Sequence, residues 1–105
     1  MGRPSIAEQR RIEIGRALQT CMVRNGSYSQ TSVKDIAQEA NVAGSLIHHY
    51  FESKDEILFM MTDLALLSLT NELEELLHAK TEEQRLNKLR EIQNDKENNC
   101  FLFNL

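Results

Sequence analysis

The sequence has little proline and glycine, and no segment of it alternates apolar and polar residues for long. One Pro and four Gly occur among its 105 residues, while Leu, Glu, Ala and Lys are abundant. A half-buried β-strand would show a period of two, which is missing here. We therefore predict an all-α protein.

Two other absences bear on where the protein acts. Cys21 and Cys100 form no C-x-x-C pair, which suits a reducing cytoplasm. No stretch approaches the ~20 apolar residues of a membrane span, and the N-terminus lacks the apolar segment of a signal peptide. We therefore expect a cytoplasmic protein that has no membrane partner.

The usual signatures of an enzyme are missing as well. There is no glycine-rich phosphate loop, and no set of side chains has the spacing of metal ligands. No nucleophile lies where local structure would bring it to a base. We therefore expect no catalytic activity, no cofactor and no bound metal.

Charge is divided unevenly along the chain, although the net charge is only −4. Residues 1–54 contain seven Lys and Arg against five Asp and Glu, whereas residues 55–105 contain five against eleven. This modest break indicates an N-terminal half with an anionic partner and a C-terminal half without one.

Helix starts are marked by pairs of residues with the spacing of a capping box. In such a box a hydroxyl and a side chain three residues later satisfy free backbone N–H groups. The pairs are Ser5 and Glu8, Ser32 and Asp35, Ser53 and Glu56, and Thr81 and Gln84. The pair Asn25-Gly26 ends the first helix, since both residues tolerate the left-handed conformation of a C-terminal cap.

Together with the apolar periodicity, these signals predict five helices. The helices cover about residues 6–25, 32–40, 44–50, 54–79 and 81–94. The final run, Cys100 to Leu105, is apolar and has no C-terminal cap. Either a further helix docks on this run or the chain is a piece of a longer protein, and we favour the second interpretation.

Residues 32–51, SVKDIAQEANVAGSLIHHYF, have the layout of a helix-turn-helix. Ala37 is the small residue that a close helix crossing needs, and Asn41 tolerates the left-handed conformation of a tight turn. Ile36 and Ile47 can close over Val42, which would hold a second helix too short to persist alone. Its outer face then stays free, as reading of a DNA major groove requires.

Two neighbouring histidines of this second helix, His48 and His49, have several possible roles. Adjacent helical residues diverge by about 100°, so the pair cannot easily share one metal ion, for which a spacing of four residues is useful. One of them could be a buried structural residue. We favour contact with DNA, and this interpretation depends largely on a family resemblance.

The stretch TSVKDIAQEANVAGSLIHHYFESKDEIL resembles the DNA-binding region of the TetR/AcrR family of bacterial transcriptional regulators. The residues that carry the likeness are Thr31, Ile36, Ala37, Val42, Ile47, Tyr50, Phe51, Ser53, Lys54 and Ile57. The resemblance implies a three-helix DNA-binding domain over residues 1–53. Over residues 54–105 it implies the first long helices of an incomplete helical domain that binds ligand and forms the dimer.

The resemblance also implies partners: a palindromic operator in double-stranded DNA, a second copy of the chain, and a small effector that releases the DNA. The protein would thus be a homodimeric repressor. By position, the implied DNA contacts are Arg3, Thr31, Ser32, Lys34, Gly44, Ser45, Leu46, His48, His49, Tyr50 and Lys54. Few of these side chains are permanently cationic, so specific binding would need two half-sites.

The chain departs from the family pattern at three positions of this region. Asn41 replaces the common glycine of the turn, Ala43 stands where a capping Ser or Thr is frequent, and His48 stands where a tyrosine often touches phosphate. These departures and the low positive charge motivate an alternative, a helical protein-interaction module that has lost DNA binding. If His48 contacts a DNA phosphate, its protonation would strengthen DNA binding below about pH 6.5.

Overall fold

The computed structural model describes residues 5–105, except for the side chains of residues 95–98. In chain order the elements are α1 (Ile6–Asn25), α2 (Val33–Ala40), α3 (Gly44–Tyr50), α4 (Lys54–Leu77), α5 (Glu82–Asn98) and a 3-10 helix, η1 (Cys100–Asn104). The described residues contain no strand, so the predicted all-α fold is confirmed. The largest difference from the predicted helices is the end of α5, which continues to Asn98.

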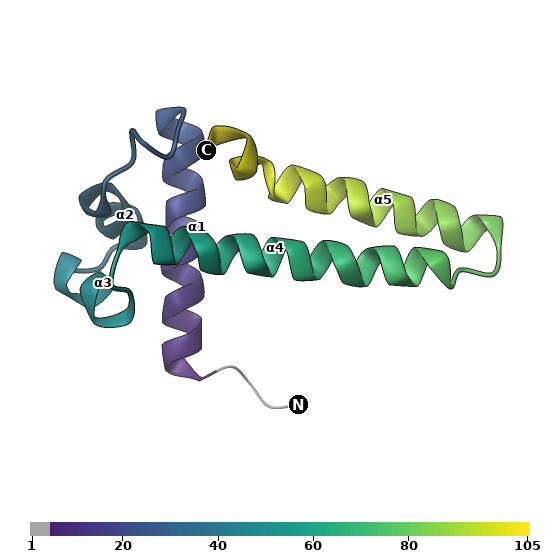
Figure 1. Ribbon diagram of the computed structural model, residues 1–105, viewed down its shortest axis with the longest axis horizontal. Helices are drawn as coiled ribbons and strands as arrows, with labels where there is room; N and C mark the ends of the chain where they lie inside the picture. Colours follow the sequence, from purple (N-terminus) through teal and green to yellow (C-terminus); the bar gives the residue numbers. More distant parts are fainter. Residues whose placement is uncertain (1–4) are drawn as a thin grey trace.

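The helices form two parts, a compact block of α1, α2 and α3 and a long hairpin of α4 and α5. In Figure 1, α2 and α3 lie on one side of α1, while α4 and α5 run antiparallel as a hairpin that extends away on the other side. The last element, η1, returns to the C-terminal end of α1. The molecule measures 50 × 35 × 19 Å.

The predicted caps do start the helices. Four hydroxyls accept hydrogen bonds of 3.1–3.3 Å from the N–H group three residues later; they belong to Ser5, Ser32, Ser53 and Thr81. A full capping box forms at α2, where the N–H of Ser32 donates to the Asp35 carboxylate at 3.0 Å. At α4 and α5 the returning side chains, Glu56 and Gln84, accept instead from the N–H one residue before the cap.

Two residues with left-handed backbone end α1 and α2, as the sequence predicts. Gly26 has φ 91°, a value at which any side chain would be strained. Asn41 has φ 57° and ψ 47°, a conformation that asparagine adopts more readily than most residues. The N–H of Val42 then donates to the carbonyl of Ala37 at 3.0 Å, which closes the turn between α2 and α3.

One apolar core joins α1, α2, α3, the start of α4 and η1. Its largest side chains are at most 2% exposed and belong to Ile14, Leu18, Met22, Ile36, Ile47, Phe51, Ile57 and Phe101. Burying a side chain of this size stabilises the fold by about 1.5–3 kcal/mol. Because a helix of seven residues does not persist alone, α3 depends on this core for its order.

The apolar run at the end of the chain packs on α1. Phe101 is 1% exposed, and the carbonyl of Asn104 accepts a hydrogen bond of 2.7 Å from the N–H of Tyr28. Phe101 and Ile57 share their core with α1, α2 and α3. The division into domains of residues 1–53 and 54–105 therefore stays a prediction.

α1 and α4 touch closely at one glycine. A Cβ atom added at Gly15 would lie 2.3 Å from the sulfur of Met61, a distance that non-bonded atoms do not reach. Glycine at this position therefore lets α4 pass directly over α1, and this crossing fixes the direction in which the α4–α5 hairpin leaves the block.

Candidate nucleic-acid interface

α3 is fixed along its inner side. Ile47 is 2% exposed, and the carbonyl of Ile47 accepts a hydrogen bond of 2.9 Å from the N–H of Phe51, where the helix ends. At the other end Ala43 makes no side-chain cap bond, as its residue type predicts. The core, rather than a cap, thus holds α3 in place.

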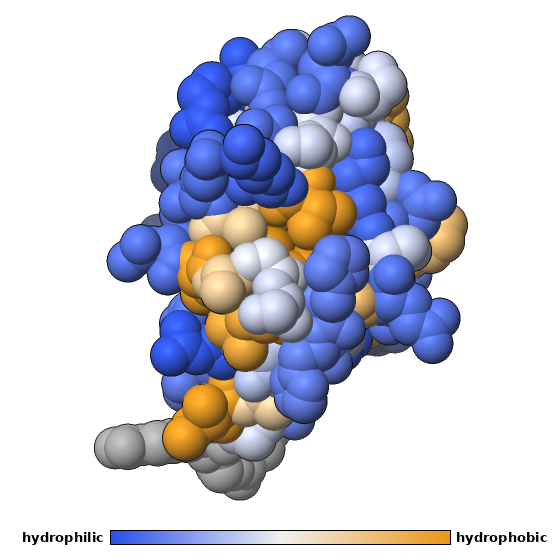
Figure 2. Space-filling view, turned by 90° about the vertical axis from the view of Figure 1, so that its left-hand side faces the viewer, coloured by the Kyte–Doolittle hydropathy of each residue, from blue (hydrophilic) through white to orange (hydrophobic). Residues whose placement is uncertain are grey.

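Most of the residues that the resemblance selects lie on the outer side of α2 and α3. Those that are exposed are Ser32, Lys34, Gly44, Ser45, His48 and His49, while Leu46 and Tyr50 are half-buried. A Cβ atom at Gly44 would meet nothing within 4 Å, so the backbone there is open to close approach. Figure 2 shows this side of the molecule, with apolar residues at its centre and hydrophilic residues around them.

Two further predicted contacts, Thr31 and Lys54, are instead engaged inside the protein. Thr31 is 1% exposed, and its hydroxyl donates to the carbonyl of Ser27 at 3.0 Å. The Nζ of Lys54 donates to the carbonyls of Tyr28 and Thr31 at 3.0 and 2.8 Å. These side chains fasten the loop before α2 to the start of α4.

Tyr28 is the centre of this loop contact and was not selected from the sequence. Its ring lies 3.9 Å below the Lys54 Nζ, and its hydroxyl donates to Asp55. Burial and the hydrogen bond to Asp55 raise the pKa of Tyr28 far above its ordinary value, so it stays protonated. Since its backbone N–H binds Asn104, Tyr28 joins the loop, α4 and η1.

Arg11 supports α3 through a contact that the sequence pattern does not predict. The pattern puts Arg11 on the solvated side of the first helix. Its Nη1 instead donates to the carbonyl of Tyr50 at 2.9 Å, and its guanidinium lies 4.5 Å from the centroid of the Phe51 ring. Arg11 therefore ties α1 to the C-terminal end of α3, a contact between residues far apart in the sequence.

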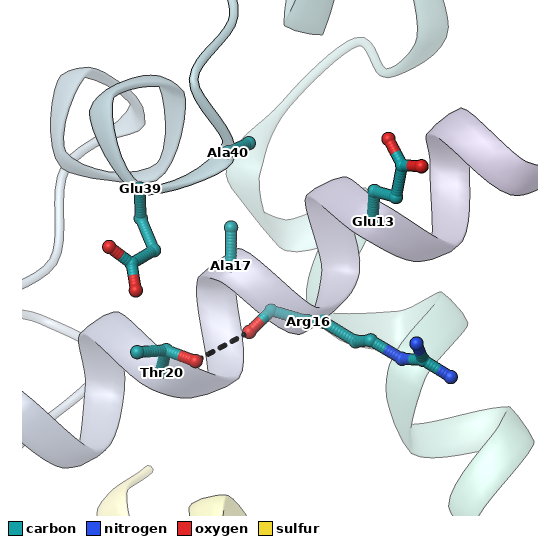
Figure 3. A pocket seen from close by; sticks show the side chains of 6 residues that line it. All are labelled: Glu13, Arg16, Ala17, Thr20, Glu39 and Ala40. Carbon is teal, nitrogen blue, oxygen red and sulfur yellow. Dashed lines mark hydrogen bonds between the residues drawn. The ribbon is translucent and has the colours of Figure 1, made fainter.

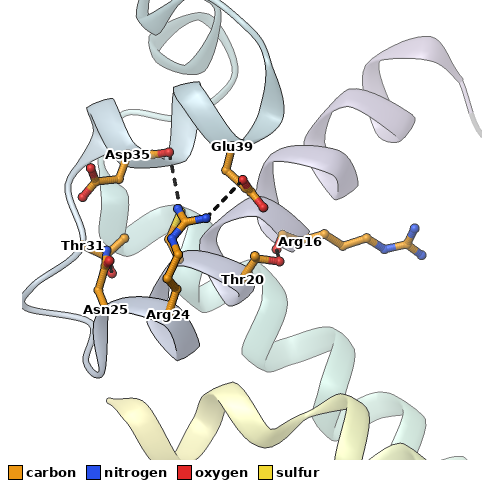
Figure 4. Close-up of polar contacts among 8 residues, drawn as sticks. Arg16, Thr20, Arg24, Asn25, Thr31, Asp35 and Glu39 are labelled. Atoms are coloured by element: carbon orange, nitrogen blue, oxygen red, sulfur yellow. Dashed lines mark hydrogen bonds and ion pairs between the residues drawn. The ribbon is translucent and has the colours of Figure 1, made fainter.

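An ion pair joins α1 to α2, as Figure 4 shows. Arg24 lies 3.4 Å from the carboxylate of Glu39, and it also donates to the sulfur of Cys21 at 3.4 Å. The exposed pair contributes at most about 1 kcal/mol. Cys21 is buried, and burial raises the pKa of its thiol, which lowers its reactivity at neutral pH.

A shallow polar groove of about 320 Å³ lies between α1 and α2 and is drawn in Figure 3. Ala17 and Ala40 form its apolar part, and Glu13, Arg16, Thr20 and Glu39 surround them. The Thr20 hydroxyl donates to the carbonyl of Arg16 at 3.1 Å. None of the residues predicted to contact DNA lines this groove.

Three observations concern the remaining sequence predictions. No helix in the described part of the chain is long and apolar enough to cross a membrane. Among residues 5–94 and 99–105, no group of three His, Cys, Asp or Glu side chains could hold a metal ion. Arg3, the predicted contact in the N-terminal arm, lies outside the described residues.

Comparison with known proteins bears on the same region. Residues 23–61 match the family model described as bacterial regulatory proteins, tetR family. The chain is also similar to the HTH-type transcriptional regulator HbdR of Aromatoleum sp. (strain CIB). Identity to this relative is 40% over 57 residues, which cover 54% of this chain and 24% of the relative. No solved structure matches the chain significantly.

The arrangement of α2 and α3 defines a helix-turn-helix protein. The family match covers both of these helices and the start of α4. Residues 23–61 are thus similar to the tetR family of bacterial regulatory proteins, and the resemblance seen in the sequence is confirmed. The chain spans about a quarter of the length of the relative that it matches.

Proposed function

We propose that the protein is a sequence-specific transcriptional regulator whose α3 reads the major groove of double-stranded DNA. The observation that carries this proposal is α3 itself, which is short, exposed along its outer side and fixed on its inner side by Ile47. A rigid platform that presents a helix in this way is what helix-turn-helix proteins use to read bases. The match of residues 23–61 to the tetR family model supports the same conclusion.

Within this proposal, base reading falls to few side chains. Lys34 donates to a guanine edge, and Leu46 contacts a thymine methyl group. The bare backbone at Gly44 allows the close approach that such contacts need.

Phosphate contacts surround this reading surface. Ser32, His48, His49 and Tyr50 hold the DNA backbone, Ser45 lies against the bases, and Arg3 enters the neighbouring minor groove. Thr31 and Lys54 act indirectly, because they fasten the loop that sets the position of α2.

We further propose that the regulator is a homodimer on a palindromic operator. Lys34 is the one Lys or Arg within α2 and α3, so electrostatic attraction of a single domain to DNA is weak. Two copies place two α3 helices on half-sites about 34 Å apart, or a multiple of that distance. A small effector bound beyond α4 would change the distance between the two α3 helices and release the operator. Since the operator stays bound until the effector arrives, the protein acts as a repressor.

A gel-shift experiment with the protein and its own promoter region tests the proposal. We expect a shift that persists against excess unrelated DNA and weakens steeply as salt rises, since phosphate contacts release counterions. A control fragment of the same length with scrambled sequence should shift only at much higher protein concentration. Equal binding of both fragments would count against sequence-specific reading.

The low positive charge of α2 and α3 favours one alternative, a protein-interaction module that has lost DNA binding. Under this alternative the outer side of α3 contacts a protein, and no DNA fragment binds selectively. Absence of any salt-sensitive shift, for a protein shown to be folded, would favour the alternative.

A further inference from the structure

The C-terminal end of α3 is held by a side chain of another helix. The last carbonyls of an α-helix have no partner within the helix and need one from elsewhere. The carbonyl of Tyr50, the last residue of α3, accepts a hydrogen bond of 2.9 Å from the Nη1 of Arg11. Arg11 belongs to α1, whose N-terminal half lies beside α3 in Figure 1. Since Ala43 makes no cap bond at the start of α3, the side-chain contact that fixes this helix lies at its end.

The same guanidinium makes a second contact at the next residue. Its central carbon lies 4.5 Å from the centroid of the Phe51 ring, and Phe51 is 2% exposed in the core. A cation over an aromatic face is attracted by the ring, more strongly where water is excluded. Arg11 therefore joins the last residue of α3 to the buried ring that follows it, and two contacts fix the orientation of its guanidinium.

Arginine suits this pair of contacts better than lysine does. The guanidinium is planar and has several N–H donors, so it can donate to a carbonyl while it lies over a ring, whereas the ammonium of lysine is a compact charge. Arg11 makes no ion pair with residues 5–94 or 99–105, while its neighbour Arg10 pairs with Glu13 at 3.3 Å. The charge of Arg11 is thus committed to the end of α3.

Tyr50 passes this constraint to the outer side of α3. The centroid of its ring lies 5.0 Å from that of the His49 ring, with an angle of 76° between the two planes. Tyr50 is half-buried and His49 is exposed, so the tyrosine supports the exposed histidine from the inside. A displaced Tyr50 would therefore displace His49 as well, and both residues are proposed contacts to the DNA backbone.

We infer that Arg11 is a positioning residue for DNA recognition, which acts through α3 and does not touch DNA itself. It fixes the C-terminal end of α3, and with it Tyr50 and His49, for their contacts with phosphate. Phosphate contacts set the register of a reading helix on the bases. A loosened end of α3 therefore weakens selective binding more than it weakens binding to unrelated DNA. The inference rests on the proposed function for this DNA part only.

Amide hydrogen exchange without DNA tests whether Arg11 fixes the end of α3. The N–H of Phe51 donates to the carbonyl of Ile47 and reports on the end of α3, while the N–H of Ile36 donates to the carbonyl of Ser32 and reports on α2. In Arg11→Met, exchange of the Phe51 amide should become at least fivefold faster relative to that of Ile36. Equal acceleration of both amides, or of neither, would overturn the inference.

Two further variants control this comparison. Arg10→Met removes the exposed cation next in the sequence and should leave the ratio of the two exchange rates unchanged. Arg11→Lys keeps the charge without the planar group, so its ratio should lie between those of the wild type and Arg11→Met. If Arg11→Met does not fold, Arg11→Lys carries the test, and a wild-type ratio there would refute the role of the guanidinium.

Affinity for the operator fragment and for unrelated DNA of the same length tests the DNA part. Arg11→Met should bind the operator at least tenfold more weakly, bind unrelated DNA as the wild type does, and keep the salt dependence of the wild type. A slope of log affinity against log salt that falls by about 0.9 would make Arg11 a direct phosphate contact. That result, or an equal loss of affinity for both fragments, would contradict the positioning role.

These results separate the inference from the proposed function. Selective DNA binding that Arg11→Met does not change leaves the regulator proposal standing and refutes the positioning role. A wild-type chain that binds no DNA selectively refutes the regulator proposal, and the exchange of the Phe51 amide still decides whether Arg11 fixes α3.

Discussion

At the scale of single residues, the surface that we propose contacts DNA depends as much on the backbone as on charge. Gly44 starts α3 with open space above its backbone, whereas Gly26 is glycine because its φ of 91° excludes a side chain. The two glycines therefore have different roles, one in proposed DNA contact and one in chain reversal. Substitution by alanine distinguishes them.

We expect Gly44→Ala to leave the folding stability unchanged or slightly higher, because alanine favours helix and its methyl group meets no atom of the protein. Affinity for the operator should fall at least tenfold, since the methyl group intrudes on the DNA. Gly26→Ala is the control and should cost roughly 1 kcal/mol or more of stability. Urea unfolding and fluorescence anisotropy measure the two effects, and undiminished DNA affinity in Gly44→Ala would remove this residue from the interface.

The capping box of α2 gives the protein a specific sensitivity to acid. Hydrogen bonds from the backbone and side chain of Ser32 hold the pKa of Asp35 below its ordinary value of 3.8. The folded state therefore favours the ionised carboxylate, and the stabilisation is complete above pH 3.8 and is lost as pH falls through the lower folded value. Asp35→Asn removes this titration.

Unfolding of the wild type and Asp35→Asn between pH 2 and pH 7 measures the contribution of Asp35. We expect the wild type to be more stable at pH 5 to 7, and the difference between the two proteins to shrink towards zero at the acid end. A difference that stays constant with pH would show that the capping carboxylate does not stabilise α2 through its charge.

Lys54 shows where a family resemblance and a structure assign different roles to one side chain. A lysine that neutralises a phosphate contributes about 0.9 to the slope of log affinity against log salt. Because its Nζ donates to the carbonyls of Tyr28 and Thr31, we expect Lys54→Met to lower stability by about 1–3 kcal/mol. The salt slope should stay unchanged in DNA titrations of the folded variant. A slope reduced by about one would restore Lys54 as a phosphate contact.

At the scale of helices, much of the structure is readable because its determinants are local. The limits of α1, α2 and α3 follow from caps and left-handed residues within a few positions of each end, such as Ser32 and Asn41. The roles of Arg11, Thr31 and Phe101 follow from contacts with distant parts of the chain, which no local pattern contains. Sequence reasoning therefore found the outer side of α3 and the buried Ile47 on its inner side, and it missed the contact of Arg11 that ties α3 to α1.

The crossing of α1 and α4 makes a second prediction at this scale. Gly15→Ala should cost about 1–3 kcal/mol of stability, because its methyl group meets the Met61 side chain. In a Met61→Ala background the same substitution should cost clearly less, since the obstructing side chain is gone. Urea unfolding of the four proteins gives the coupling energy, and purely additive effects would contradict the close contact.

At the scale of the whole molecule, the two opposite sides of the fold carry different kinds of residue. The α2–α3 end carries the exposed helix that we propose reads DNA, and the α4–α5 hairpin carries acidic residues and exposed leucines. The contacts of Tyr28 with Asp55, Lys54 and Asn104 connect the two ends through the loop before α2.

The central claim is that α2 and α3 contact DNA, and one measurement tests it most directly. The affinity of the operator fragment is measured for the wild type, for the double variant Lys34→Ala with His49→Ala, and for Arg90→Ala on the exposed surface of α5. All three proteins should fold alike, since each substituted side chain is exposed. We predict that the double variant loses at least tenfold in affinity while Arg90→Ala binds as the wild type does. Unchanged DNA affinity in the double variant would contradict the account and favour the protein-interaction module.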